Sequence, residues 1–346
     1  MQNSSLAKWL TGFAVSAALA ASAQAALTVS YQFNGNGNWS LDAVGGNSTP
    51  VGNIQAIVPL GSVVEKAFLY SSLHSSSVVP TVNFDGTVIS GATWTALGIH
   101  TNGYLQAFRT DVTTQVAAKI GGGSASTFTF SINSESPNST IDGQALAIVY
   151  SNPLEQQRTI AFLDGFSASG GDMTSINLAS PFTAAQLADP NFEALMSLGI
   201  GYGFQPGSQG SQASTVDVNG GRLTSSAGGY DDGEAANGGL ITIGGIGDSP
   251  TNPANPFQTD SGGSRYDDEL YTLTSFLAAG QSQIVVNTTN PSRDDNIFFA
   301  GFNITASAGV NQPPPPPTNR VPDAGSSVGL LGLALAGLAA LRRKRA

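Results

Sequence analysis

The 346-residue sequence contains no cysteine and only two histidines, His74 and His100. The absence of cysteine excludes a disulfide staple and a thiolate metal site. Stability must therefore come from a packed core, and the chain is long enough to bury one. A Ser-His-Asp triad would have to use one of the two histidines, and no nucleophile-elbow sequence accompanies either. His74 lies among serines and His100 precedes a loop sequence, so we expect both to be exposed.

Nucleotide motifs and positive charge are also scarce. Gly244–Gly247 lacks the strand-then-helix context of a phosphate loop, and no Gly-Lys-Ser/Thr sequence occurs. Residues 26–320 hold 8 Lys and Arg against 22 Asp and Glu, a net charge of −14. A surface with this charge repels nucleic acid and anionic lipid and favours cations. We therefore expect no nucleic-acid partner.

The N-terminus has the features of an export signal. Lys8 supplies a positive start, Leu10–Ala20 is apolar, and Ala23–Ala25 forms an A-x-A cleavage sequence. The apolar run is too short to span a bilayer, which needs about 20 residues. The alternative is a buried N-terminal helix. The pattern predicts a signal peptide over residues 1–25, removed by signal peptidase to leave a chain that begins at Ala26.

The C-terminus has a motif, an apolar run and a basic end, in that order. The motif residues are Val321, Pro322, Asp323, Ala324 and Gly325. The basic residues are Arg342, Arg343, Lys344 and Arg345. Between them, the apolar residues 328–341 would form a helix of about 21 Å, short of a ~30 Å hydrocarbon core. By the positive-inside rule the basic end stays cytoplasmic, which places everything before it outside.

This tail resembles the PEP-CTERM sorting signals, specifically the variant with a Val-Pro-Asp-Ser-Gly motif. Ala324 stands where that variant usually has serine. The resemblance implies recognition and cleavage by an exosortase, a membrane enzyme of Gram-negative bacteria that make extracellular polymer. It implies a protein that is exported, membrane-anchored and then placed at the cell surface or in the extracellular matrix. The alternative, an ordinary C-terminal anchor, gives the same topology.

The body, residues 26–309, has the pattern of an all-β protein. Leu27–Phe33 alternates as a half-buried strand, and Asn34–Asn38 is typical of a turn. The clearest hairpin is Thr81–Ile89, where Asp85 and Gly86 suit a two-residue type I′ turn. Many short strands predict a β-sandwich, either one elaborated domain or two packed sandwiches with a soft division at 151–180. Further strands are expected at 63–69, 104–109, 126–132, 145–150, 159–163, 240–243, 283–287 and 297–304.

A few segments depart from the strand pattern. Asp111 can cap a short helix through Val112–Lys119. Thr183–Leu187 and Asp189–Leu198 are predicted to form a short helical insertion, with Asp189 as its N-cap. The prolines within residues 310–320 predict a stiff polyproline linker between the body and the tail.

Part of the body is similar to an uncharacterised extracellular β-domain family found in adhesin-like surface proteins. The segments that carry the similarity are Lys66–Tyr70, Phe108–Thr113, Gly143–Tyr150 and Ile160–Phe166, in that order. The similarity implies a β-sandwich over about residues 60–305 and a non-catalytic role.

Acidic loops are the candidate metal sites. The candidate calcium ligands are Asp231, Asp232, Glu234, Asp260, Asp267 and Asp268, and Glu269 ends the second cluster. Calcium takes six to eight oxygen ligands with flexible geometry, which loops rich in Asp, Asn and Gly can supply. The alternative is a set of solvated acidic loops. Calcium binding predicts a melting temperature that rises with calcium; an unchanged melting curve after chelation would refute it.

Two functions remain open from the sequence. The first is a non-catalytic, adhesin-like surface or matrix protein that contacts extracellular polysaccharide or another surface protein. The second is a carbohydrate-active enzyme or carbohydrate-binding module that uses loop carboxylates of residues 228–269. Candidate sugar-stacking aromatics are Trp39, Trp94, Tyr202, Tyr230 and Tyr266. Two carboxylates converging in a concave groove lined by aromatics would favour the enzyme.

Overall fold

The computed structural model describes residues 27–46, 50–74, 78–99, 105–121, 125–136, 140–167, 170–201, 214–228, 241–250, 269–290 and 296–314. The predicted signal helix and the predicted anchor helix lie outside these residues. In the described part of the chain no helix is both long and apolar enough to cross a membrane.

The described body consists mainly of antiparallel strands, which confirms the all-β prediction. The strands are β1 (Thr28–Gly45), β2 (Val51–Ile57), β3 (Val63–Leu73), β4 (Thr81–Phe84), β5 (Thr87–Ile89), β6 (Thr95–Ile99), β7 (Gln106–Asp111), β8 (Thr127–Ser136), β9 (Ile141–Ser151), β10 (Gln157–Asp164), β11 (Asp172–Leu178), β12 (Ala194–Gly201), β13 (Ser214–Val218), β14 (Gly221–Ala227), β15 (Ile241–Ile243), β16 (Leu270–Thr272), β17 (Gln283–Thr289), β18 (Asn296–Ile304) and β19 (Ala308–Val310). The helices are α1 (Thr113–Gly121) and α2 (Ala184–Leu187), with short 3-10 turns η1 (Gly91–Thr93) and η4 (Thr274–Phe276).

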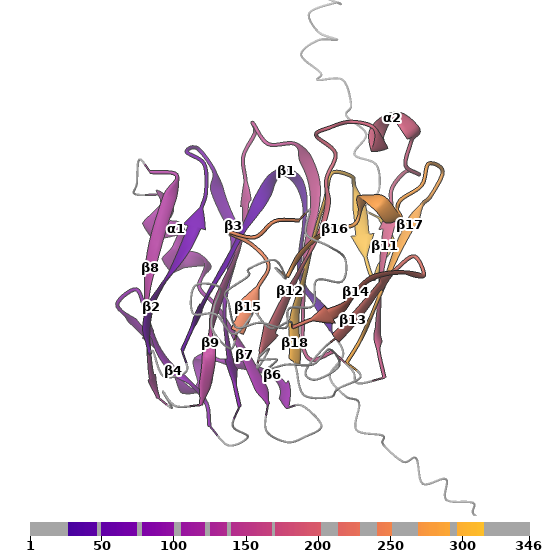
Figure 1. Ribbon diagram of the computed structural model, residues 1–346. Helices are drawn as coiled ribbons and strands as arrows, with labels where there is room; N and C mark the ends of the chain where they lie inside the picture. The colour runs from indigo at the N-terminus through magenta and orange to yellow at the C-terminus, as the bar shows by residue number, and fades with distance from the viewer. Residues whose placement is uncertain are drawn as a thin grey trace, which may run out of the picture.

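The strands form three sheets. The largest has ten strands in the order β15-β12-β18-β10-β1-β9-β3-β7-β6, with β16 also paired to β12. A four-stranded sheet has the order β2-β8-β4-β5, and a five-stranded sheet has the order β14-β13-β17-β11-β19. Figure 1 shows the four-stranded sheet at the left, the five-stranded sheet at the right and the ten-stranded sheet between them.

Strand β1 joins the two halves of the large sheet. Its first half pairs with β10 as far as Asn36, and its second half pairs with β9 from Gly37 onward. The turn predicted at Asn34–Asn38 is therefore wrong: this polar, glycine-rich segment is the place where the strand changes partner. Gly37 is required there because a Cβ atom would lie 2.2 Å from the Tyr150 carbonyl oxygen.

Three hydrophobic clusters lie between the layers. One packs β3, β9 and α1 against the four-stranded sheet, and another packs β10, β12 and β18 against the five-stranded sheet. The third cluster fills the space between the two halves of the ten-stranded sheet and includes Tyr70, Phe162 and Phe299. The body therefore stacks as two sandwiches joined through this central aromatic cluster. Apart from the first half of β1, the chain passes from the first sandwich to the second between β9 and β10.

Local sequence signals succeed in some segments and fail in another. The hairpin of β4 and β5 is confirmed, with positive φ at Asp85 (48°) and Gly86 (86°). The first predicted helix is α1, and the start of the helical insertion is α2, whose Gln186 amide is capped by the Thr183 hydroxyl. The helix predicted at Asp189–Leu198 is wrong.

The failed segment becomes strand β12, which begins at Ala194 and lies between β18 on one side and β15 and β16 on the other. Its alternate residues Ala194, Met196, Leu198 and Ile200 are buried in one core. Hydrogen bonding on both edges and burial on both faces outweigh the weak helical preference of the segment.

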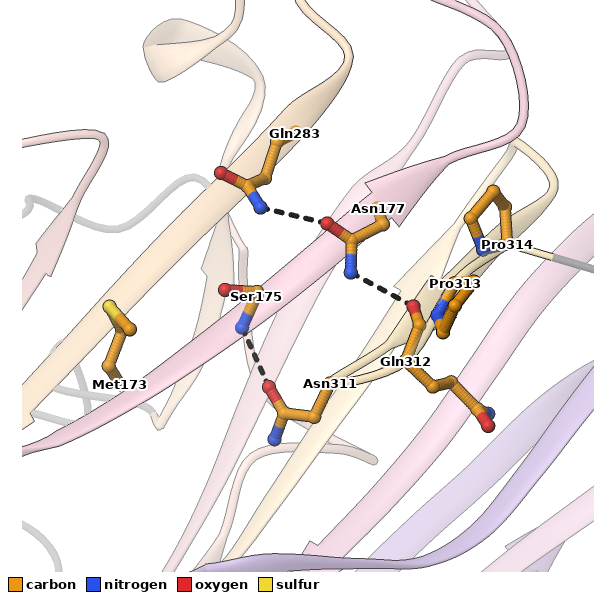
Figure 2. Close-up of a pocket in the computed structure, with 8 residues that line it drawn as sticks. All are labelled: Met173, Ser175, Asn177, Gln283, Asn311, Gln312, Pro313 and Pro314. Carbon is orange, nitrogen blue, oxygen red and sulfur yellow. Dashed lines mark hydrogen bonds between the residues drawn. The ribbon is translucent and has the colours of Figure 1, made fainter.

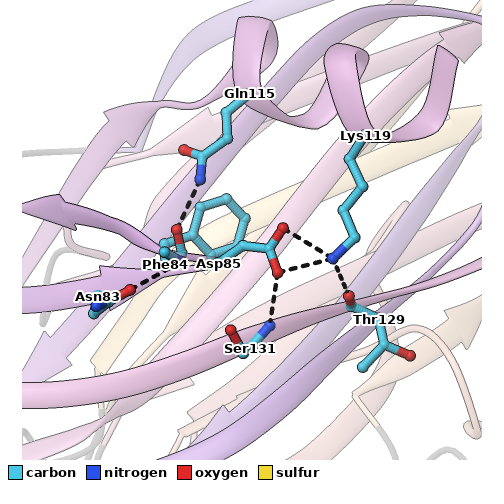
Figure 3. Close-up of polar contacts among 8 residues, drawn as sticks. Asn83, Phe84, Asp85, Gln115, Lys119, Thr129 and Ser131 are labelled. Carbon is cyan, nitrogen blue, oxygen red and sulfur yellow. Dashed lines mark hydrogen bonds and ion pairs between the residues drawn. The ribbon is translucent and has the colours of Figure 1, made fainter. Parts of the chain in front are cut away.

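Helix α1 is fastened to the β4–β5 hairpin by polar contacts (Figure 3). Lys119 Nζ lies 2.8 Å from both carboxylate oxygens of Asp85 and 4.7 Å from the centroid of the Phe130 ring. Gln115 Nε2 donates to the Phe84 carbonyl oxygen at 2.7 Å. These contacts hold the helix over the end of the first sandwich, so its role is structural.

Candidate functional site

The end of the body, where the chain leaves toward the tail, is held firmly on the five-stranded sheet. Strand β19 pairs with β11, and the chain then continues alongside β11. The Asn311 amide donates to the Ser175 carbonyl oxygen at 2.7 Å, and Asn311 Oδ1 accepts from the Ser175 amide at 2.8 Å. Asn177 Nδ2 donates to the Gln312 carbonyl oxygen at 2.9 Å (Figure 2). Hydrogen bonds therefore hold the chain beside β11 as far as Gln312.

Gln32 of β1 ties the same segment to the large sheet. Its Nε2 donates to the Ala308 carbonyl oxygen at 3.1 Å, and its Oε1 accepts from the Val310 amide and from Gln312 Nε2, both at 3.0 Å. Strand β1 begins two residues after the predicted signal-peptide cleavage position. Both ends of the body are thus joined at one place, and we name residues 308–314 the exit segment.

A groove of about 580 Å³ runs beside the exit segment. Its lining, shown in Figure 2, consists of Met173, Ser175, Asn177, Gln283, Asn311, Gln312, Pro313 and Pro314. None of these residues is charged, and Gln283 Nε2 donates to Asn177 Oδ1 at 2.8 Å. The side chains that line the groove can donate and accept hydrogen bonds, but they include no titratable group for acid–base or nucleophilic chemistry.

His74 and its partners form a second polar group, at the end of β3. His74 Nδ1 lies 2.9 Å from Asp142 Oδ1, and Ser72 Oγ donates to Asp142 Oδ2 at 2.9 Å. Asp142 is fully buried, and the His74 side chain is 26% exposed, so the expectation of an exposed His74 is wrong. The carboxylate lies between serine and histidine, whereas in a hydrolase triad the histidine lies between the other two. These three residues are therefore not arranged as a triad.

We expect His74 to make stability depend on pH. The hydrogen bond that the His74 ring donates to the Asp142 carboxylate raises the pKa of His74 above its ordinary value of 6.5. A raised folded-state pKa gives stability that is fully present below the unfolded pKa and is lost as pH rises through the folded pKa. The free energy of unfolding should therefore fall as pH increases above about 6.5.

The matched control is His74→Gln, in which this fall should be smaller. Asp42 does not interfere in the window from about pH 7 to 9 because burial raises its pKa only to about 6. The measurement is urea unfolding at several pH values in that window. Identical slopes for the two proteins would contradict the assignment.

The predicted calcium ligands belong to loops that are not among the described residues. Asp231, Asp232, Glu234, Asp260, Asp267 and Asp268 lie outside the described residues, as do His100, Tyr202, Tyr230 and Tyr266. Glu269 is described and fully buried; its carboxylate accepts from the Gly228 amide at 2.8 Å and from the Tyr271 hydroxyl at 2.9 Å. Among the described residues, no three His, Asp or Glu side chains lie close enough together to hold a metal ion.

The two tryptophans that the structure describes have different environments. Trp94 is buried, with its ring 6.5 Å from that of Phe108 in the first sandwich. Trp39 is half-buried and lines a cleft of about 320 Å³. The lining of this cleft, which we name the Trp39 cleft, is Asn38, Trp39, Ser40, Leu41, Ile57, Tyr150, Gly245, Ile246 and Leu270. The lining contains no carboxylate.

The chain carries a VPDSG-CTERM motif, matched over residues 320–345. This confirms the predicted tail and indicates a protein that is exported and sorted to the cell surface by an exosortase. The match does not include the body, and no curated protein matches the sequence significantly.

Solved structures resemble the body only distantly. One is a β-porphyranase of glycoside hydrolase family 86 from the human gut bacterium Bacteroides plebeius, with 11% identity over 84% of this chain and 37% of that one, at a TM-score of 0.21. Another is wild-type BuGH86 in complex with neoagarooctaose, with 11% identity over 83% of this chain and 34% of that one, at a TM-score of 0.22. The chain thus spans about a third of the length of these structures. At such TM-scores the likeness carries no argument about function.

Proposed function

We propose that the protein is a non-catalytic module displayed at the cell surface or in the extracellular matrix, where it acts as an adhesin. The observation that carries the proposal is the VPDSG-CTERM motif at residues 320–345. A processed tail of this kind places the folded body outside the membrane, with the prolines that start at Pro313 as a stiff spacer. The partner would be extracellular polysaccharide or another surface protein.

The exit segment supports this proposal because its hydrogen bonds can carry a force from the tail into the body. A force applied to the tail would reach the body first through the hydrogen bonds of Gln312 and Asn311, and then through β19, which pairs with β11. Gln32 passes the same load to β1, which belongs to both sandwiches. Because these bonds are made by residues up to Gln312, removal of residues 321–346 leaves every one of them in place.

A non-catalytic role is also supported by the polar groups of the body. Glu269, Asp142 and Asp164 are buried carboxylates that bond to neighbouring backbone or side chains of the body itself. Buried carboxylates with such partners hold structure together. Calcium binding by the acidic loops remains part of the proposal, with the chelation test given above.

The proposal predicts where the protein goes when its tail is changed. Deleting residues 321–346 should release the body into the medium, because the membrane segment and the processing motif are both lost. Ala324→Ser, which restores the usual motif residue, is the matched control and should remain at the cell. Immunoblots of cell and medium fractions give the measurement. Unaltered retention of the deletion variant would contradict the assigned role of the tail.

A further inference from the structure

The Trp39 cleft lies where the two sandwiches meet. It is lined by the middle of β1, the ends of β2 and β9, and residues that follow or form β15 and β16. Clefts of about 300–1,000 Å³ at such junctions, with apolar walls and a few placed polar groups, are the usual sites of small ligands. The volume of about 320 Å³ lies at the small end of this range.

The indole ring of Trp39 packs closely against a glycine of the second sandwich. A Cβ atom at Gly301 of β18 would lie 2.9 Å from Cζ3 of Trp39, so only glycine lets the ring lie this close to the strand. At the rim, Ile57 is 46% exposed and lies beside Trp39 in the lining of the cleft. The cleft therefore offers an aromatic surface beside an exposed aliphatic one.

A chain of polar side chains, in which Arg158 and Asn303 are buried, orients an amide at the cleft. Arg158 Nη1 bonds to Glu193 Oε2 at 2.6 Å and to Asn303 Oδ1 at 3.3 Å, and Asn303 Nδ2 donates to Asn38 Oδ1 at 2.7 Å. Asn38 Oδ1 also accepts from the Trp39 amide at 2.9 Å.

The order of these bonds decides which group of Asn38 is left for a ligand. With its oxygen occupied, Asn38 has its Nδ2 donor left, and no described residue accepts from it. Asn303 is fully buried, and a buried polar chain of this kind is costly unless it fixes a geometry.

We infer that the Trp39 cleft binds an uncharged saccharide unit. A sugar ring has a face of C–H groups that packs on an aromatic ring and a rim of hydroxyls that accept and donate hydrogen bonds. Trp39 supplies the ring and Asn38 Nδ2 a donor, while the hydroxyl of the buried Ser40, which accepts from the Ile57 amide at 2.9 Å, can still donate its own proton. The lining carries no charge, and residues 26–320 have a net charge of −14, which together favour a neutral sugar over a uronate. This inference names the class of ligand for the proposed adhesin, and it rests on that proposed function because a displayed body would meet extracellular saccharides.

The test measures saccharide binding by the full chain in mild detergent. The probes are neutral hexose and N-acetylhexosamine oligosaccharides, matched oligouronates, and an uncharged apolar peptide. Calorimetry and tryptophan emission give the readouts, because the half-buried Trp39 should respond and the buried Trp94 should not. We expect at least one neutral oligosaccharide to bind more tightly than its uronate counterpart.

Two variants and a control separate binding from folding. Trp39→Ala and Ile57→Arg should each weaken binding by about tenfold or more. Ile57→Arg changes an exposed side chain and should melt like the wild type. Trp94→Phe, a tryptophan change away from the cleft, should bind normally.

Four results would overturn the inference. The Trp39→Ala and Ile57→Arg variants could both bind sugar with wild-type affinity, or the protein could bind oligouronates more tightly than neutral sugars. The protein could also bind only the apolar peptide, or bind none of the neutral oligosaccharides. If none of the sugars binds but the tail-deleted chain is released, only this inference fails; if sugar binds but the deleted chain is retained, only the sorting proposal fails.

Discussion

Replacing Phe299 with alanine is expected to lower the free energy of unfolding by about 3–5 kcal/mol. Phe299 is fully buried, and its ring centroid lies 5.4 Å from that of Tyr70 in the first sandwich and 5.2 Å from that of Phe162 in the second. The substitution leaves a cavity in the layer that joins the sandwiches. Dispersion contacts are therefore lost on both sides at once.

Urea unfolding followed by tryptophan emission measures this effect, and Leu154→Ala is the control. Leu154 is 92% exposed, so its loss should change stability by no more than about 0.5 kcal/mol. Trp94 reports on the first sandwich and Trp39 on the junction, so the Phe299→Ala protein should still unfold in one transition at a lower urea concentration. A variant as stable as the wild type would contradict the joined-sandwich description.

Asp164→Ala is the second substitution with a large expected effect, about 3 kcal/mol of lost stability. Asp164 Oδ2 accepts from Arg109 Nη1 at 2.6 Å and from the Tyr70 hydroxyl at 3.1 Å. Burial and the Asp164 charge raise the pKa of Tyr70 well above 10, so its hydroxyl keeps its proton and donates. Removing the carboxylate leaves this fully buried donor and the Arg109 charge without their acceptor.

Two control variants bracket the Asp164 effect. Asp164→Asn keeps an acceptor for Tyr70 and should be less harmful than alanine. Asp111→Ala removes the partner of Lys66, a pair in which the Asp111 side chain is 51% exposed, and also the side-chain cap of α1; together these should cost about 1 kcal/mol, well below the loss expected for Asp164→Ala. Thermal unfolding of all three variants gives the comparison. Equal losses for Asp164→Ala and Asp111→Ala would refute the buried role of Asp164.

The sequence was sufficient where one short segment contains its whole signal. The Asp85-Gly86 hairpin and the capped helix α1 depend on contacts within a few residues. The sorting tail is likewise defined by the order of motif, apolar run and basic end. Strand β12 and the middle of β1 could not be predicted, because their conformations depend on strands far away in the chain.

In the candidate sites, too, single residues could be predicted from the sequence, but their distant partners could not. Trp39 could be named from the sequence as a sugar-stacking aromatic, but its glycine seat is 262 positions away in the chain, at Gly301. The partner of His74 could not be found, because Asp142 is 68 residues away and reaches it only by the pairing of β3 with β9. Residue types in the sequence indicate which side chains could stack on a sugar or titrate. Which residues lie beside them depends on how distant strands pair in the sheets.

The central claim is that the body is exported and that its tail is processed at the membrane. Mass spectrometry of the protein recovered from the cell surface tests this claim most directly. The account predicts a chain that begins at Ala26 and contains no peptide from the apolar run at 328–341 or from Arg342–Arg345. A surface form that retains the arginine-rich end, or a body found in the cytosol, would contradict it.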